Sequence, residues 1–171
     1  HPITEASLSE KASIIGRTGI MLLSCGTGAW RVRSSMNTLA RELGITCTAD
    51  IGLLSIEYTC IDGGNCYTES LCLFNTGVNT SKLYRMEEFV NKFAENCKKM
   101  SGDELHTLLD RIHEIHGFYS PPFLGLAAAV ACCAFTFLLG GGPVEMLCAF
   151  LGAGAGNYLR AKMNQHHLTL F

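Results

Sequence analysis

The chain has 171 residues, a formal net charge of −2 and 16% charged residues, against about 25% in an average soluble protein. The length allows one ordinary domain, or a small domain followed by a membrane segment. The charge balance excludes a nucleic-acid-binding surface, which would require a basic stripe. Charged residues are scarce mainly after residue 117, so the first two thirds have an ordinary composition.

Nine cysteines are distributed along the chain, an odd number with no C-x-x-C pair. A disulfide scaffold would be short, loop-rich and evenly paired, whereas this chain has long periodic segments. We therefore interpret the thiols as small apolar side chains in a reducing compartment. Cys60, Cys66 and Cys72 recur every six residues, but two neighbouring strands would place them so without a metal site.

Two helices are predicted at the start of the chain. Ser7 and Glu10 have capping-box spacing, so the first helix should begin near Ser7 and end within residues 25–28, which contain two glycines. A second helix should run over residues 29–43, where Gly44 stops it. Both helices carry apolar side chains at helical spacing, which marks the faces that pack in a core.

Three strands should follow, because apolar and polar residues alternate over 45–51 and again over 54–60. The sequence Asp62-Gly63-Gly64-Asn65 predicts a hairpin turn, with a return strand over 66–74. The connections are too short for crossovers, so we expect an antiparallel three-stranded meander.

Two more helices complete the predicted first domain. One should run from Ser81 to Met100, and the other should begin at the capping box of Ser101 and end at Gly117. The fold class is therefore α+β, with the element order α-α-β-β-β-α-α over residues 1–117.

The remaining residues, 118–171, contain an apolar block in which Glu145 is the one charged side chain before Leu159. Two apolar runs, at about 121–139 and 143–160, flank a Gly-Gly-Gly-Pro turn. A bilayer core needs roughly 20 apolar residues in a helix, so we predict a transmembrane helical hairpin in contact with membrane lipid. The alternative is a buried hairpin in a soluble core, although residues 127–134 are apolar on every face.

Basic residues flank the apolar block on both sides. Applied to them, the positive-inside rule places both ends of the hairpin, and the N-terminal domain, in the cytoplasm of a multi-pass protein of the inner or plasma membrane. The residues concerned are Lys98, Lys99, Arg111, Arg160 and Lys162.

Small residues recur in both apolar runs. Gly152 and Gly156 have the G-x-x-x-G spacing at which helix backbones touch, and Gly125 and Ala129 have the same spacing. Two helices alone barely enclose a path, so these small faces predict further helices, in this chain or in a partner.

Catalytic motifs are absent from the sequence: there is no nucleophile elbow, no H-E-x-x-H and no P-loop. Four polar residues share one face of the fourth predicted helix and could hold a metal, but we favour a solvated face: Asp103, His106, Asp110 and His113. Cys25 lies near a helix start, where a thiol can be acidified, but a packed residue is the simpler interpretation. We therefore expect no catalytic residue, no metal and no cofactor.

Glu145 allows two interpretations. An ionisable group at membrane depth is costly and often functional, but the first turn of a helix can also hold it at the interface, near the positive helix end. Asn157 and Thr136 are the only strongly polar side chains available at depth.

Several segments, in this order, resemble the threonine/serine exporter family. They are Gly26-x-x-Ala29-Trp30-Arg31-Val32, Asp62-Gly63-Gly64-Asn65, Gly77-Val78-Asn79, Val90-Asn91, Tyr119-Ser120-Pro121-Pro122, Leu159-Arg160 and His166-His167-Leu168. The likeness covers nearly the whole chain and is closest to the larger subunit of two-component succinate exporters. The family has glutamates where this chain has Gly28 and Arg33, so any role of those carboxylates is absent or moved.

The resemblance implies an exporter component that moves threonine and serine, or succinate-like dicarboxylates, out of the cytoplasm. It also implies a second small membrane subunit or a homo-oligomer, and further membrane helices beyond Phe171, so that the chain is truncated. We predict substrate contacts at Arg31, Asn79, Glu145 and Asn157. The alternatives are a membrane-tethered scaffold, or a hydrolase-like domain with Cys25 or a serine as nucleophile.

Overall fold

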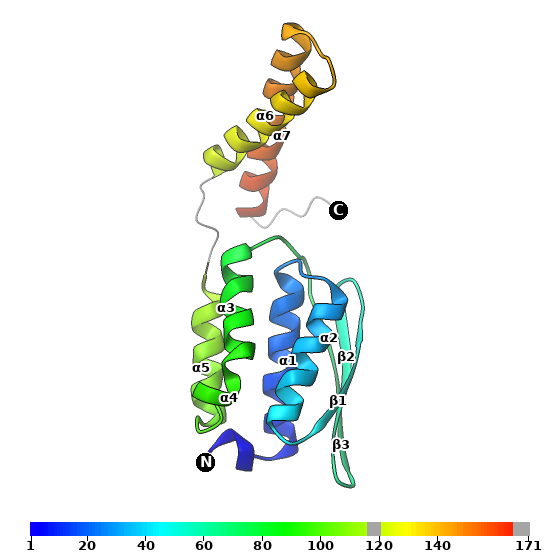
Figure 1. Ribbon diagram of the computed structural model, residues 1–171, viewed down its shortest axis with the longest axis vertical. Coiled ribbons are helices and arrows are strands. Elements are labelled where there is room, and N and C mark those ends of the chain that lie inside the picture. The colour runs from blue at the N-terminus through cyan, green and yellow to red at the C-terminus, as the bar shows by residue number, and fades with distance from the viewer. Residues whose placement is uncertain (116–120, 166–171) are drawn as a thin grey trace. The chain divides into compact units, whose positions relative to one another are not determined.

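The computed structural model describes residues 1–115 and 121–165. By its contacts the chain divides into two compact units, His1–His116 and Gly117–Phe171, which are treated separately below (Figure 1). Three segments used in the predictions lie outside the described residues: Gly117, Tyr119-Ser120, and the stretch from His166 to Phe171.

The first unit begins with a short 3-10 helix, η1 (Ile3–Glu5), and two long helices. Helix α1 (Leu8–Ser24) starts where predicted, because the Ser7 hydroxyl accepts a hydrogen bond from the backbone N–H of Glu10. Helix α2 (Ala29–Glu42) ends before Gly44, whose φ of 72° suits glycine.

The three strands form an antiparallel sheet in the order β1-β2-β3, as predicted. They are β1 (Thr46–Ile51), β2 (Ser55–Asp62) and β3 (Asn65–Cys72). Gly63 forms the β2–β3 turn with a φ of 61°. The register pairs Cys47 with Cys60 and Tyr58 with Glu69, which sets the alternating side chains of one face toward the helices.

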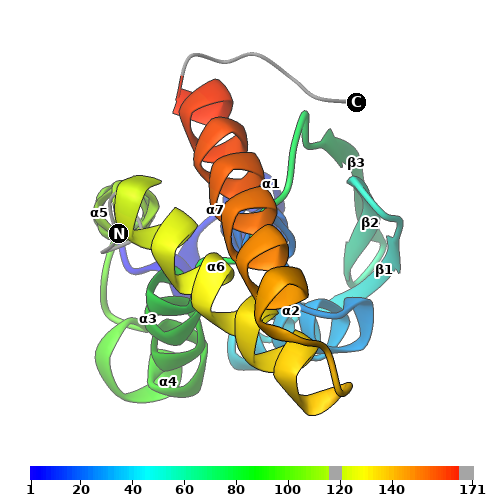
Figure 2. The ribbon, with the colours of Figure 1, turned by 90° about the horizontal axis from the view of Figure 1, so that it is seen from above.

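Glycines bring α1 close to the sheet and to α2. A Cβ at Gly16 would lie 2.4 Å from Cζ of Tyr58, and a Cβ at Gly19 would lie 2.6 Å from the sulfur of Met36. The buried Tyr58 hydroxyl lies 2.9 Å from the Ala12 carbonyl, to which it can donate. The first unit is therefore layered as sheet, then α1 and α2, then the remaining helices (Figure 2).

The prediction of one continuous third helix is wrong. It is divided into α3 (Thr80–Asn91) and α4 (Phe93–Asn96), with Lys92 outside the α-helical region. The turn at Lys92 allows Phe93 to be fully buried, edge-to-face with Phe89 at 5.6 Å, and allows Lys98 to pair with Glu42 at the end of α2.

Helix α5 (Gly102–His113) begins with the predicted capping box at Ser101 and Glu104. It ends at His113, four residues before the predicted end. Leu105 and Leu109 are fully buried and form its inward face, with Leu108 half-buried beside them.

The second unit is a helical hairpin of α6 (Pro121–Leu138) and α7 (Pro143–Gln165), which lie side by side (Figure 1). The predicted transmembrane hairpin is wrong: within residues 1–115 and 121–165, no helix has both the length and the apolarity to cross a membrane. Helix α6 has only 18 residues and opens with two prolines, and the 23 residues of α7 include Glu145, Arg160 and Lys162.

Candidate functional site

The polar face of α5 lies against α1 and α3. It carries His106, Asp110 and His113, which contact Arg17 of α1 or Lys82 of α3. We call these five side chains the polar seam. Asp103, Asp110 and His113 are exposed, as expected for a solvated face, and His106 is half-buried. The contacts of this face with Arg17 and Lys82 were not predicted.

Arg17 organises one end of the polar seam. Its guanidinium donates to Nδ1 of His106 at 3.0 Å, to the His106 carbonyl at 3.2 Å and to the Asp110 carboxylate. Because an arginine only donates, Nδ1 must be the acceptor. Nε2 then carries the proton and donates to Oγ of Ser13 at 3.2 Å.

Electrostatics keep His106 neutral and Asp110 ionised. Burial and the Arg17 charge lower the pKa of His106 below its usual value of 6.5. The hydrogen bond from Arg17 holds the pKa of the Asp110 carboxyl below its usual 3.8. This end of the polar seam thus carries one cation, Arg17, one anion, Asp110, and the neutral imidazole of His106.

Lys82 and His113 form the other end of the polar seam. Lys82 is only 8% exposed, and its Nζ donates to Nδ1 of His113 at 3.0 Å. The Lys82 charge, followed by burial, lowers the pKa of His113. Both histidines of α5 are therefore neutral at pH 7, and each faces a cation across a helix interface.

The seam can bind and release protons, but it offers no metal site. In the described parts of the chain, no group of three or more His, Cys, Asp or Glu side chains could hold a metal ion. Across the same residues no buried side-chain nitrogen or oxygen lacks a hydrogen-bond partner. A change in its protonation would therefore break existing contacts between helices.

Arg31, a predicted substrate contact, lies between α2 and α3. Its guanidinium pairs with Glu87 at 2.9 Å and lies 5.5 Å from the ring centre of Trp30. Both charged side chains are more than a third exposed, so the ion pair contributes little to stability. Arg31 remains accessible to a solute carboxylate, and its substrate role stays a prediction.

Asn79, the second predicted contact, caps α3. Its side-chain oxygen accepts from the Lys82 backbone N–H at 3.0 Å, and its nitrogen donates to the Ile115 carbonyl at 3.1 Å. Both ends of the amide are engaged in the fold. Glu87, the partner of Arg31, lies eight residues further along α3, which corresponds to about 12 Å of helix.

Glu145 and Asn157, the other predicted contacts, both belong to α7. Glu145 is exposed in the first helical turn, and Asn157 is half-buried. Twelve residues of helix separate them by about 18 Å, so α7 alone does not bring them together. Arg31 and Asn79 belong to the first unit and Glu145 and Asn157 to the second, and the role of all four as substrate contacts stays a prediction.

Small residues make the contact between α6 and α7. A Cβ at Gly125 would lie 3.1 Å from the Gly154 carbonyl oxygen, and a Cβ at Gly154 would lie 3.2 Å from Cβ of Ala129. By contrast, a Cβ at Gly152 or Gly156 would meet nothing within 4 Å. Gly125 and Ala129 therefore pack on the Gly154 face of α7, and the face with Gly152 and Gly156 stays open. The prediction of further helices against these small faces stays a prediction.

A comparison with family models assigns the chain to a family. Residues 13–171 match the ThrE model, described as "Putative threonine/serine exporter". The chain belongs to this family. No curated protein and no solved structure matches it. Exporters of this kind are membrane transport proteins, so the matched family is one of transporters rather than of enzymes, in accordance with the resemblance noted in the sequence.

In this member of the ThrE family, Cys25 lacks the surroundings of a nucleophile. The side chain is 1% exposed, and its thiol donates to the Met21 carbonyl at 3.1 Å. Burial raises the pKa of the Cys25 thiol, which keeps it protonated. The contacts of Cys25 are those of a packed residue at the end of α1.

Sequence reasoning missed Arg17 and Lys82. Arg17 interrupts a mainly apolar stretch of α1, which was an available signal, whereas Lys82 lies between Ser81 and Leu83 and no such signal marks it. Their partners lie 31 to 93 positions away in the sequence, so no local pattern could connect them to α5.

Proposed function

We propose that this chain is a component of a membrane exporter that moves threonine and serine, or succinate-like dicarboxylates, out of the cytoplasm. The observation that carries the proposal is the family match over residues 13–171, which includes most of the first unit and all of the second. No catalytic constellation in the described residues competes with it.

The surface of the α6–α7 hairpin supports the proposal. Large apolar side chains are exposed on both helices, among them Leu126, Val130, Phe135, Phe137, Val144, Leu147 and Leu151. Exposed apolar surface of this extent marks an interaction site. We propose that a second small subunit of the exporter, or another copy of the chain, covers this surface.

The first unit would lie on the cytoplasmic side of the inner or plasma membrane and capture substrate. Substrates of all the proposed classes carry a carboxylate, which a guanidinium binds through two parallel hydrogen bonds. The exposed Arg31–Glu87 pair is suited to exchange, because a substrate carboxylate can replace Glu87 at little cost. Asn79, Glu145 and Asn157 are the further proposed contacts.

Efflux from intact cells tests this function. Cells with and without the full gene are preloaded with labelled threonine, serine or succinate, and the initial rate of release is measured. We expect release of at least one compound to be faster when the gene is present.

An Arg31→Gln variant should lose most of this difference, whereas Arg41→Gln, an exposed arginine elsewhere on α2, should keep it. Unchanged release of all three compounds would exclude export of these substrates. Full activity of Arg31→Gln would show that Arg31 is not a substrate contact.

A further inference from the structure

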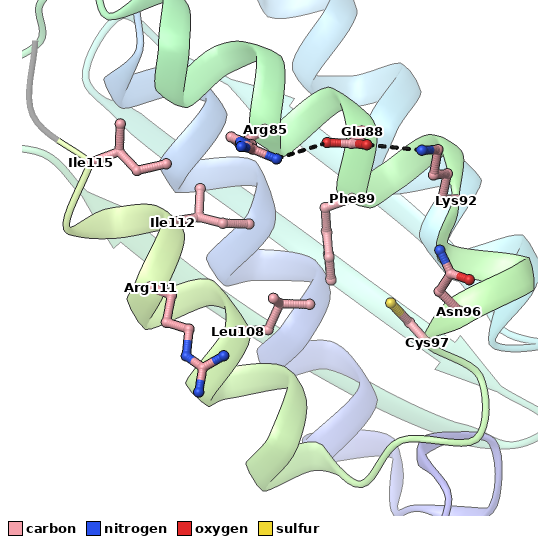
Figure 3. Close-up of a pocket in the computed structure, with 10 residues that line it drawn as sticks. All are labelled: Arg85, Glu88, Phe89, Lys92, Asn96, Cys97, Leu108, Arg111, Ile112 and Ile115. Carbon is pink, nitrogen blue, oxygen red and sulfur yellow. Dashed lines mark hydrogen bonds and ion pairs between the residues drawn. The ribbon is translucent and has the colours of Figure 1, made fainter. Parts of the chain in front are cut away.

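A groove of about 420 Å³ lies between α3–α4 and α5, and neither Arg31 nor any residue of the polar seam lines it. Its volume is within the range of about 300–1,000 Å³ that is typical of small-molecule sites. Figure 3 shows Phe89 of α3 and Leu108 of α5 facing one another across it. The groove is therefore built by side chains from both sides, and is not a simple gap along one helix.

The floor of the groove is apolar. Phe89, Ile112 and Cys97 are at least 90% buried, and Leu108 and Ile115 are half-buried beside them. Burying apolar surface of a ligand against such a floor contributes roughly 25 cal/mol per Å². Threonine, serine and succinate carry little apolar surface and would gain little from this floor.

The rim of the groove is cationic. Arg85, Lys92 and Arg111 line it, together with one carboxylate, Glu88. Glu88 is already shared, since Arg85 lies 3.4 Å and Lys92 2.8 Å from its oxygens along α3 (Figure 3). Arg111 of α5 has no hydrogen-bond or ion-pair partner among the described residues.

We propose that this groove binds a small amphipathic carboxylate, with the apolar body on the floor and the carboxylate at Arg111. The excess of two cations on the rim complements one negative charge and disfavours a cationic ligand. The planar guanidinium matches a carboxylate through two parallel hydrogen bonds. Because the transported substrates proposed above lack an apolar body, this ligand is an effector distinct from them.

Methyl NMR of the full chain, with labelled isoleucine and leucine methyl groups, tests the proposal. Octanoate is the probe, and octan-1-ol and octylammonium are the neutral and cationic comparisons. We expect octanoate to shift the methyl signals of Leu108, Ile112 and Ile115 with saturation. Octan-1-ol should bind about tenfold more weakly, which is the usual effect of one charge-assisted hydrogen bond.

Two variants distinguish the contribution of the Arg111 charge to binding from that of the apolar floor. Arg111→Gln should weaken octanoate binding about tenfold and leave octan-1-ol unchanged, while Arg41→Gln, on α2, should change neither. Leu108→Asn should weaken both probes equally. The proposal is overturned if octanoate and octan-1-ol bind equally well, if octanoate binding is insensitive to Arg111→Gln, or if the saturable shifts occur only in α6 and α7.

Discussion

The ammonium group of Lys82 lies 3.0 Å from Nδ1 of His113, across the interface between α3 and α5. A second histidine of α5, His106, faces the guanidinium of Arg17 in the same way. Both contacts require a neutral imidazole, because protonation would place two cations side by side. The packing of α5 on α1 and α3 is therefore coupled to protonation.

The first prediction is a loss of stability in mild acid. The pKa values of His106 and His113 are lowered below 6.5 in the folded chain, so below about pH 6.5 the unfolded chain binds more protons. The free energy of unfolding should fall as the pH drops from about 6.5 toward the folded-state pKa values. Urea denaturation at about pH 7.5 and at about pH 5 measures this free energy. Both pH values lie above the range in which Asp110 titrates, so that carboxyl does not contribute to the difference.

A Lys82→Gln variant isolates the His113 contribution to this pH dependence. Without the neighbouring charge, the pKa of His113 should move back toward its ordinary value, and the pH dependence should become shallower. Lys99→Gln changes an exposed lysine and should retain the original dependence. An identical pH dependence in Lys82→Gln would show that the Lys82–His113 contact does not set it.

The second prediction concerns Gly16 of α1. Alanine normally favours a helix over glycine by about 1 kcal/mol. Here the new Cβ would collide with the Tyr58 ring, and overpacking of this kind costs about 1–3 kcal/mol. We expect Gly16→Ala to lower the free energy of unfolding in urea. Gly64→Ala, where a Cβ meets nothing within 4 Å, is the matched control, and equal stabilities would contradict the close packing.

The third prediction concerns the α6–α7 contact. Gly154→Leu should push the two helices apart by about 2 Å, within the 8–10 Å range of interhelical distances. Gly152→Leu should not, because that face of α7 is open. Spin labels at the exposed positions Leu126 and Leu151 report the separation. If both variants gave the same distance, the contact through Gly154 would be wrong.

The fourth prediction concerns the capping box of α5. The Ser101 hydroxyl accepts from the Glu104 backbone N–H at 3.3 Å, and the Glu104 carboxylate accepts from the Ser101 N–H. Ser101→Ala should therefore destabilise the first unit by about 1 kcal/mol. Ser70→Ala, on an exposed position of β3, should change the urea midpoint little. A Ser101→Ala midpoint equal to the wild type would show that the cap is dispensable.

The features predicted correctly from the sequence are those set by neighbouring residues. Ser7 and Ser101 cap helices through residues three positions away, and Gly63 and Gly44 occupy positive-φ positions. The alternation along β1 and β2 likewise gave the antiparallel meander.

Features set by distant contacts were not predicted. The break at Lys92 depends on Phe93 reaching the core and on Lys98 reaching Glu42. The α6–α7 contact depends on the rotation of α7, which spacing alone does not determine, and it uses Gly154. The transmembrane hairpin was inferred from apolar composition. Helix α6 is too short for a span, and α7 carries charged residues near both of its ends, so neither helix is long and apolar enough.

Uptake by everted membrane vesicles tests the central claim, that the chain belongs to a working exporter, most directly. In vesicles from cells that express the full gene, export from the cytoplasmic face becomes uptake into the lumen, with any native partner subunit present. We predict faster uptake of labelled threonine, serine or succinate than in vesicles from cells without the gene. Equal uptake of all three compounds in the two preparations would contradict the account.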